Sequence, residues 1–205
     1  VISIYTLALG IATPLSGFLS DRFGIKRMYV GGLAAFLVGS LLCGLAPTLS
    51  SSIWLLVAAR AAQGFGGGIA QPLGSALLFS TFPPKEQGTA LGIFGIALVV
   101  APALGPILGG FLVDQGLWRW IFFINLPIGL VGVFLANRFL RERRPETVPA
   151  LDPLGLITAV VGFGAVLYAA SIAADQGWGA GNVLLWFGVG GVSLLLFGLI
   201  ELFVA

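Results

Sequence analysis

The sequence QGTALGIFGIALVVAPALGPILGGFLV, at residues 87–113, decides the class of fold. It contains no Asp, Glu, Lys or Arg, and it exceeds the ~20 apolar residues that a helix needs to cross a bilayer. A helix satisfies all of its backbone polar groups internally, which lipid requires. The stretch therefore predicts a membrane-spanning helix.

The composition of the whole chain extends this prediction. Of its 205 residues, 58% are hydrophobic and 9% are charged, whereas a soluble domain has about 25% charged residues. This excludes a soluble enzyme, a disordered chain and a nucleic-acid-binding protein. The chain has no His, which excludes His-based metal sites and triads, and Cys43 has no second Cys to pair with. We expect an all-α integral membrane protein that is not an enzyme, embedded in lipid, with no metal site or cofactor.

Apolar runs separated by charges and by Gly/Pro clusters predict about seven transmembrane helices. The expected ranges are Val1–Leu19, Met28–Ala46, Ser52–Phe82, Gln87–Val113, Trp118–Leu140, Pro153–Ala174 and Asn182–Phe203. The third is long enough to bend near Gln71-Pro72. Because Val1 is not Met and already lies in an apolar run, we expect a fragment of a longer protein; a chain that naturally begins there is the alternative.

Charge placement predicts the orientation. If the loops alternate sides, one side holds eight cations: Arg22, Lys26, Arg27, Lys85, Arg138, Arg141, Arg143 and Arg144. Lys and Arg near helix ends are retained in the cytoplasm, so this side is expected to be cytoplasmic. Interfacial tryptophans fall near the opposite side, at Trp54, Trp118, Trp120, Trp178 and Trp186. We therefore expect a multi-pass protein of the inner (plasma) membrane.

Two short stretches of the sequence resemble each other. GFLSDR at residues 17–22 ends the first helix, and GFLVDQ at residues 110–115 ends the fourth, on the opposite side. Similar sequences in opposite orientations are expected of inverted repeats, which many secondary transporters contain.

Three constellations are candidates for function. The first is the predicted loop GFLSDRFGIKR at residues 17–27, in which Gly17 would permit close helix approach and Asp21 could pair with a helix end or an Arg. The simpler interpretation is a positively charged anchor loop with a turn glycine.

The second constellation surrounds Arg60, the cation inside a predicted span. Burying Arg in a membrane costs about 2.5–3.5 kcal/mol on insertion scales, so an intramembrane Arg is a functional candidate; snorkelling to the interface is the alternative. Gln63 and Gly64 share its helix face by their spacing. The nearby Gly-x-Gly-x-Gly lacks a P-loop ending and follows no strand, so it is not a nucleotide site.

The third constellation is APALGPILGG at residues 101–110. Its two prolines remove backbone donors and its glycines open a flat face, which favours a moving transporter helix over a static anchor. A kinked packing helix is the alternative.

Together these constellations resemble the signature motifs of the major facilitator superfamily. The loop motif matches at Gly17, Leu19, Asp21, Arg22, Gly24 and Lys26, with Ile25 in place of a basic residue. The Arg motif matches at Leu56, Arg60, Gln63 and Gly64. The antiporter motif matches at Gly105, Pro106, Gly109 and Gly110, with Ala101 in place of glycine. The stretches WRWIFFINLP at residues 118–127 and DPLG at residues 152–155 resemble the fourteen-helix drug:proton antiporters.

The resemblance covers essentially the whole chain and implies family helices two to eight of a major facilitator-type bundle. Residues 1–144 would form the N-terminal bundle without its first helix, and residues 145–205 a linker helix pair. The implied function is proton-coupled efflux of small amphipathic drugs or toxic compounds by alternating access, with a small molecule and protons as partners.

The resemblance also implies residue roles. Arg60 and Gln63 would serve proton coupling. The gating loop would comprise Gly17, Asp21, Arg22, Gly24, Lys26 and Arg27. The antiporter-motif helix would limit proton leak. An exporter of a metabolite, amino acid or siderophore is one alternative, and a non-transporting receptor or scaffold on a transporter fold is another.

Overall fold

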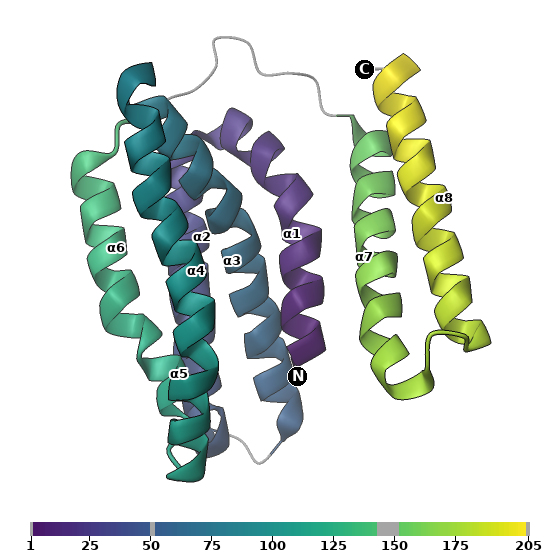
Figure 1. The fold of residues 1–205 in the computed structure, drawn as a ribbon, viewed down its shortest axis with the longest axis horizontal. Helices are drawn as coiled ribbons and strands as arrows, with labels where there is room; N and C mark the ends of the chain where they lie inside the picture. Colours follow the sequence, from purple (N-terminus) through teal and green to yellow (C-terminus); the bar gives the residue numbers. More distant parts are fainter. Residues whose placement is uncertain (1, 50–51, 143–151, 204–205) are drawn as a thin grey trace.

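The computed structural model describes residues 2–49, 52–142 and 152–203, and its regular elements there are helices (Figure 1). Their bounds are α1 Ile2–Phe23, α2 Ile25–Leu49, α3 Ile53–Thr81, α4 Pro84–Asp114, α5 Trp120–Phe123, α6 Asn125–Phe139, α7 Pro153–Gln176 and α8 Gly181–Phe203. Within these described residues, seven spans are long and apolar enough to cross a membrane, with α5 and α6 sharing the span Trp120–Phe139. The expected class and number of spans are confirmed; Val1 lies outside the described residues.

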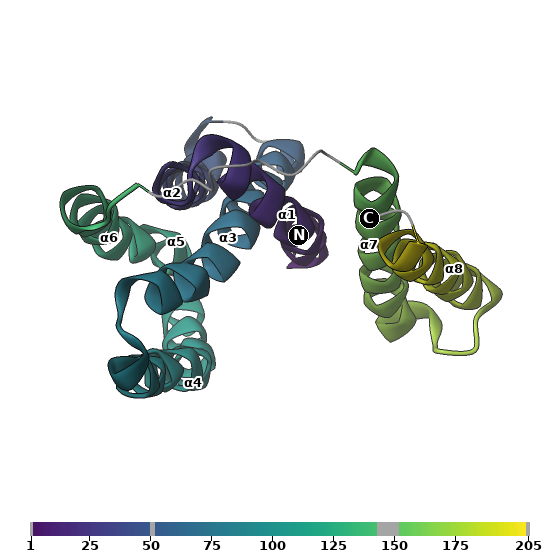
Figure 2. The same ribbon diagram turned by 90° about the horizontal axis from the view of Figure 1, so that it is seen from above.

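Helix α3 occupies the centre of the bundle, between α1 and α2 (Figure 2). Its glycines face both neighbours: a Cβ at Gly64 would meet the backbone carbonyl of Tyr5 on α1, and one at Gly66 would meet the Gly32 carbonyl on α2. Small residues let helix backbones approach closely in lipid, where no hydrophobic force between helices is available. The glycine cluster after Arg60 therefore makes α3 the scaffold on which α1 and α2 pack.

The connection between α1 and α2 is shorter than the predicted loop. Helix continues through Asp21 and Arg22 to Phe23, and α2 begins at Ile25. Gly24 alone makes the turn, with φ +98° and its N–H donating to the Ser20 carbonyl at 2.8 Å. A glycine at this left-handed position ends one helix without a longer loop, so the expected boundaries at Leu19 and Met28 were wrong.

Two further boundaries differ for reasons that involve proline. Helix α4 begins at Pro84 rather than Gln87, because proline fits the first turn of a helix, where its missing N–H costs nothing. The helix expected over Trp118–Leu140 is interrupted at Ile124. Pro127 has no N–H to donate to the Phe123 carbonyl, which weakens the helix at this point.

Helices α7 and α8 form a hairpin that packs beside α1, on the side opposite α3 (Figures 1 and 2). The two helices approach at Gly162 and Gly190, where a Cβ at Gly190 would lie 3.1 Å from the Gly162 carbonyl. Within the described residues, α7 contacts α1 and α8. The expected boundary between residues 144 and 145, together with Arg143 and Arg144, lies outside the described residues.

The spans alternate in direction, as was assumed in counting the charges on each side. The α1–α2 and α3–α4 connections and the end of α6 lie at one end of the bundle, the upper end in Figure 1. This end carries the described cations of the predicted basic side: Arg22, Lys26, Arg27, Lys85, Arg138 and Arg141. The echoed sequences end α1 at the upper end and α4 at the lower end, in opposite directions.

Candidate functional site

The centre of the candidate site is the guanidinium group of Arg60, near the start of α3. Its Nη1 donates to Gln63 Oε1 at 3.1 Å, so the structure brings the two predicted proton-coupling residues together. The guanidinium carbon also lies 4.6 Å from the ring centroid of Phe122 and 5.7 Å from that of Tyr5. Aromatic faces attract a cation by about 0.5–2 kcal/mol, which helps to offset its removal from water. Arg60 therefore points into the bundle, where the alternative interpretation expected it to snorkel outward.

A buried polar network extends from Gln63 to two neighbouring elements. Gln63 is 2% exposed, and its Nε2 donates to the hydroxyl of Ser40 on α2 at 2.9 Å. Ser40 is fully buried; its hydroxyl donates to the Phe122 carbonyl at 3.1 Å and accepts from Asn125 Nδ2 at 2.9 Å. The network thus joins α2, α3 and the break between α5 and α6.

Sequence reasoning missed Ser40 and Asn125 as members of this site. A serine between glycine and leucine in an apolar run gives no periodic signal, and Asn125 attracted notice only as part of a longer resemblance. Both were available as polar residues inside predicted spans, which are costly in lipid unless they find partners. The pairing itself depends on tertiary packing.

Arg60 keeps unused bonding capacity. Its Nε is buried without a hydrogen-bond partner, and within residues 2–49, 52–142 and 152–203 no carboxylate lies within ion-pair distance. A buried cation without a counter-ion is unfavourable in a medium of low dielectric constant. The arrangement can therefore hold an anionic group or influence the ionisation of one that approaches.

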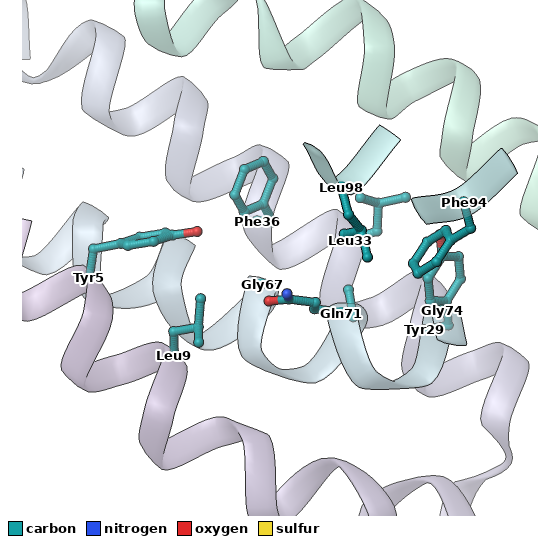
Figure 3. Close-up of a pocket in the computed structure, with 11 residues that line it drawn as sticks. Tyr5, Leu9, Tyr29, Leu33, Phe36, Gly67, Gln71, Gly74, Phe94 and Leu98 are labelled. Carbon is teal, nitrogen blue, oxygen red and sulfur yellow. The ribbon is translucent and has the colours of Figure 1, made fainter. Parts of the chain in front are cut away.

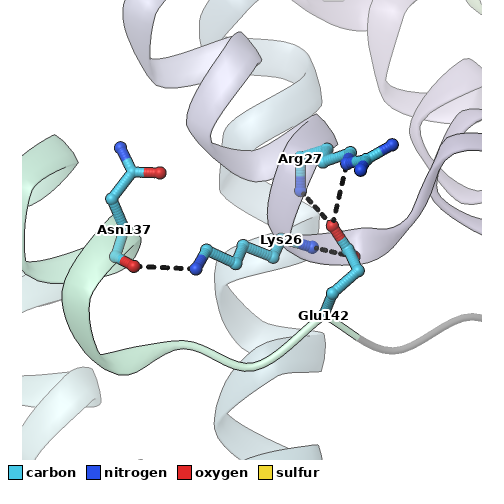
Figure 4. Close-up of polar contacts among 4 residues, drawn as sticks. All are labelled: Lys26, Arg27, Asn137 and Glu142. Atoms are coloured by element: carbon cyan, nitrogen blue, oxygen red, sulfur yellow. Dashed lines mark hydrogen bonds and ion pairs between the residues drawn. The ribbon is translucent and has the colours of Figure 1, made fainter.

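A second polar cluster lies at the end of the bundle that carries the basic residues (Figure 4). The carboxylate of Glu142 accepts from the backbone N–H groups of Lys26 and Arg27, at 3.1 and 3.3 Å, and forms an ion pair with Arg27 Nε at 3.6 Å. Lys26 Nζ donates to the Asn137 carbonyl at 2.7 Å. Glu142 thereby attaches the segment after α6 to the start of α2.

The other predicted gating residues lie close to this cluster in sequence but make different contacts. Asp21 and Arg22 occupy the last turn of α1, and the Arg22 guanidinium lies 5.8 Å from the Phe23 ring. A Cβ at Gly17 would meet nothing within 4 Å in the described part of the chain. The expectation that Gly17 permits close helix approach therefore finds no neighbouring helix here. Glu142 was not predicted, because its contact partners are distant in sequence.

The predicted antiporter-motif helix stands apart from both clusters. Helix α4 buries none of its residues within the described structure, and Cβ atoms at Gly105, Gly109 and Gly110 would meet nothing within 4 Å. Pro102 and Pro106 both lie inside the continuous helix. The face that carries Pro106 and these glycines is open.

A cavity of about 340 Å³ lies between α1, α2, α3 and α4 (Figure 3). Figure 3 shows Tyr5 at one end, Tyr29 and Phe94 at the other, and the Gln71 side chain between them. Among the described residues that line it, none carries a charge. They are Tyr5, Leu9, Tyr29, Leu33, Phe36, Gly67, Ala70, Gln71, Gly74, Phe94 and Leu98. Because Tyr5 also faces Arg60, the cavity adjoins the polar network. Such a lining suits an aromatic or aliphatic group with a few hydrogen-bonding atoms.

Comparison with known proteins identifies the family of this arrangement. The family model described as Major Facilitator Superfamily matches residues 1–205. The chain belongs to the major facilitator superfamily. This confirms the resemblance inferred from the ordered motifs and the helical bundle.

The chain is also similar to named members of this superfamily. It is 38% identical over 191 residues to the multidrug resistance protein B homolog of Mycobacterium tuberculosis, covering 93% of the chain and 35% of the relative. It is 37% identical over 190 residues to the fatty acid resistance protein FarB of Neisseria gonorrhoeae, covering 92% and 37%. It is 36% identical over 197 residues to the multidrug export protein EmrB of Haemophilus influenzae, covering 96% and 38%. The chain thus spans little more than a third of the length of these curated relatives.

Proposed function

We propose that this chain is part of a secondary active transporter that exports small amphipathic compounds in exchange for protons by alternating access. The observation that carries the proposal is the inward-facing guanidinium of Arg60, held by Gln63 and without a carboxylate partner in the described structure. Placing a cation within the membrane costs free energy, so a cation found there is expected to serve a function. In the proposed cycle, Arg60 binds and releases the negative charge of a group that carries the proton.

The proposed substrate class follows from the cavity and from the relatives. The aromatic rings of Tyr5, Phe36 and Phe94 and the amide of Gln71 would accommodate a flat or flexible apolar body with few polar atoms. The relatives are named for multidrug export and for multidrug and fatty acid resistance. Both observations favour an amphipathic compound. The relatives also favour a place in the drug:proton antiporter branch, with residues 1–205 as family helices two to eight.

The basic end of the bundle is proposed to be the cytoplasmic gate in an inner membrane. The positive-inside rule favours this orientation. Gly24 and the Glu142 carboxylate hold α1, α2 and the end of α6 together there, and Asp21 and Arg22 are placed at the surface of the same end. We propose that this rigid corner, with Gly17, Lys26 and Arg27, closes against the remainder of the transporter.

The open face of α4 is proposed to limit proton leak. Gly105, Pro106, Gly109 and Gly110 leave it without side-chain bulk, which suits a helix that slides against a moving neighbour. The α7–α8 hairpin is proposed to be a linker pair, since within the described residues it packs on itself and on α1.

The test is efflux from cells that express the full-length protein containing this sequence. Arg60→Ala should abolish efflux driven by the proton gradient while membrane insertion is retained. The matched control is Arg138→Ala, because Arg138 is exposed in the last turn of α6 and, among the described residues, its guanidinium lies against the Phe139 ring. Normal efflux by the Arg60 variant would exclude Arg60 from the mechanism, whereas absence of efflux by the wild type would favour a receptor or scaffold.

A further inference from the structure

We propose that Ser40 is a positioning residue that fixes the Gln63 amide so that its oxygen holds Arg60, and that Asn125 completes the same support. This inference rests on the proposed function, because it concerns how the coupling residue is oriented. Ser40 belongs to α2 and Asn125 to α6, whereas Arg60 belongs to α3. The coupling group would therefore be set by helices that do not carry it.

The bonding capacity of the Ser40 hydroxyl sets the direction of each of its hydrogen bonds. A serine hydroxyl has one hydrogen to donate and two lone pairs that accept. The hydrogen is committed to the Phe122 carbonyl, which can only accept. Both remaining contacts of the oxygen, at 2.9 Å each, must then be donated by the amide nitrogens of Gln63 and Asn125.

The same hydrogen bonds fix the orientation of the Gln63 amide. Since its nitrogen faces Ser40, its oxygen faces Arg60, where Nη1 donates at 3.1 Å. The guanidinium imposes the same orientation independently, because it has only donors. The amide is therefore fixed from both ends, and a rotated Gln63 would break both bonds.

The close packing of α2 against α3 makes these contacts possible. A Cβ at Gly39 would lie 2.6 Å from the backbone nitrogen of Gln63 and 2.7 Å from its Cα. The absence of a Cβ at Gly39 permits this close approach, which brings the adjacent Ser40 within reach of the Gln63 amide. The serine is thus placed by Gly39, and Gln63 by Ser40.

Without the Ser40 hydroxyl, three polar groups lose a partner at once: the carbonyl of the buried Phe122, the amide of the buried Gln63 and the amide of the partly buried Asn125. The Gln63 amide is then held only by Arg60, so the two side chains can shift together and the guanidinium loses its fixed position. Arg60 retains its charge and its aromatic neighbours. The expected defect is therefore in coupling to protons rather than in insertion or in substrate passage.

The experiment compares two rates in proteoliposomes that contain the full-length protein. One is efflux driven by a proton gradient, and the other is exchange of labelled for unlabelled substrate without a gradient. Ser40→Ala should lower the ratio of the first rate to the second at least fivefold. The matched control is Ser16→Ala: Ser16 is 3% exposed, but its hydroxyl donates at 2.7 Å to the Thr13 carbonyl of its own helix. Ser16→Ala should leave the ratio unchanged.

A merely structural role would slow both rates of the Ser40 variant equally, and that result, like an unchanged pair of rates, would overturn the inference. Wild-type transport that ignores the gradient would instead overturn the proposed function. In that case, thermal unfolding of the purified protein tests whether Ser40 and Gln63 interact. Ser40→Ala and Gln63→Leu should then be non-additive, whereas Ser16→Ala and Gln63→Leu should add. Additivity of the Ser40 pair would overturn the inference without reference to transport.

Discussion

Replacing Gly39 by alanine tests the close approach of α2 and α3 on which the polar network depends. The new Cβ would lie 2.6–2.8 Å from the backbone nitrogen, Cα and Cβ of Gln63. Because these are mainly backbone atoms, no side chain can move aside, and the helices must separate by about 0.8 Å to reach ordinary contact near 3.4 Å. A comparable separation would lengthen the 2.9 Å bond from Gln63 to Ser40 beyond hydrogen-bonding range.

The expected magnitude follows from these terms. Overpacking costs about 1–3 kcal/mol, and a lost hydrogen bond costs about 0.5–1.5 kcal/mol. Alanine recovers up to about 1 kcal/mol of helix propensity relative to glycine. The net prediction is a loss of about 0.5–3.5 kcal/mol in the free energy of unfolding.

The assay is the unfolding of purified protein in detergent, with Gly31→Ala as the control. Gly31 lies on the same helix, but a Cβ there would meet nothing within 4 Å in the described structure. The control should therefore be as stable as the wild type or slightly more so. Equal stability of the two alanine variants would refute the close approach at Gly39.

Two further predictions concern the two ends of the bundle. Glu142→Gln should speed hydrogen exchange at the Lys26 and Arg27 amides, which donate to the Glu142 carboxylate. Overall stability should change little, because the ion pair is largely exposed and worth about 1 kcal/mol or less. Unchanged exchange would contradict these two hydrogen bonds. Arg119→Leu should lower the free energy of unfolding by about 1–3 kcal/mol, because Arg119 Nε donates at 2.7 Å to the Gly44 carbonyl, which would be left without this donor. An unaltered melting temperature of this variant would contradict the contact.

Much of the fold could be predicted from local sequence. Uncharged runs such as residues 87–113 fixed the class and the number of spans, because lipid accepts few alternatives to a helix. Boundaries were less accurate where one residue decides them. Gly24 turns the chain alone, and Pro84 starts a helix where a loop was expected.

The candidate site was predictable only in part. The three-residue spacing of Arg60 and Gln63 on one helix was sufficient to predict their contact. Ser40, Asn125 and Glu142 make contacts with residues far away in sequence, so no periodicity reveals them. Their roles depend on which helices are neighbours, and that is set by packing at glycines such as Gly39 and Gly66.

The central claim, exchange of substrate for protons, is tested most directly by proton movement itself. The full-length protein containing this sequence is reconstituted in vesicles with a pH-sensitive dye, a stable proton gradient is formed, and an amphipathic substrate is added. Substrate addition is expected to dissipate the gradient in the wild type but not in Arg60→Ala. A gradient that substrate leaves unchanged in the wild type, although substrate still crosses the membrane, would contradict proton-coupled exchange.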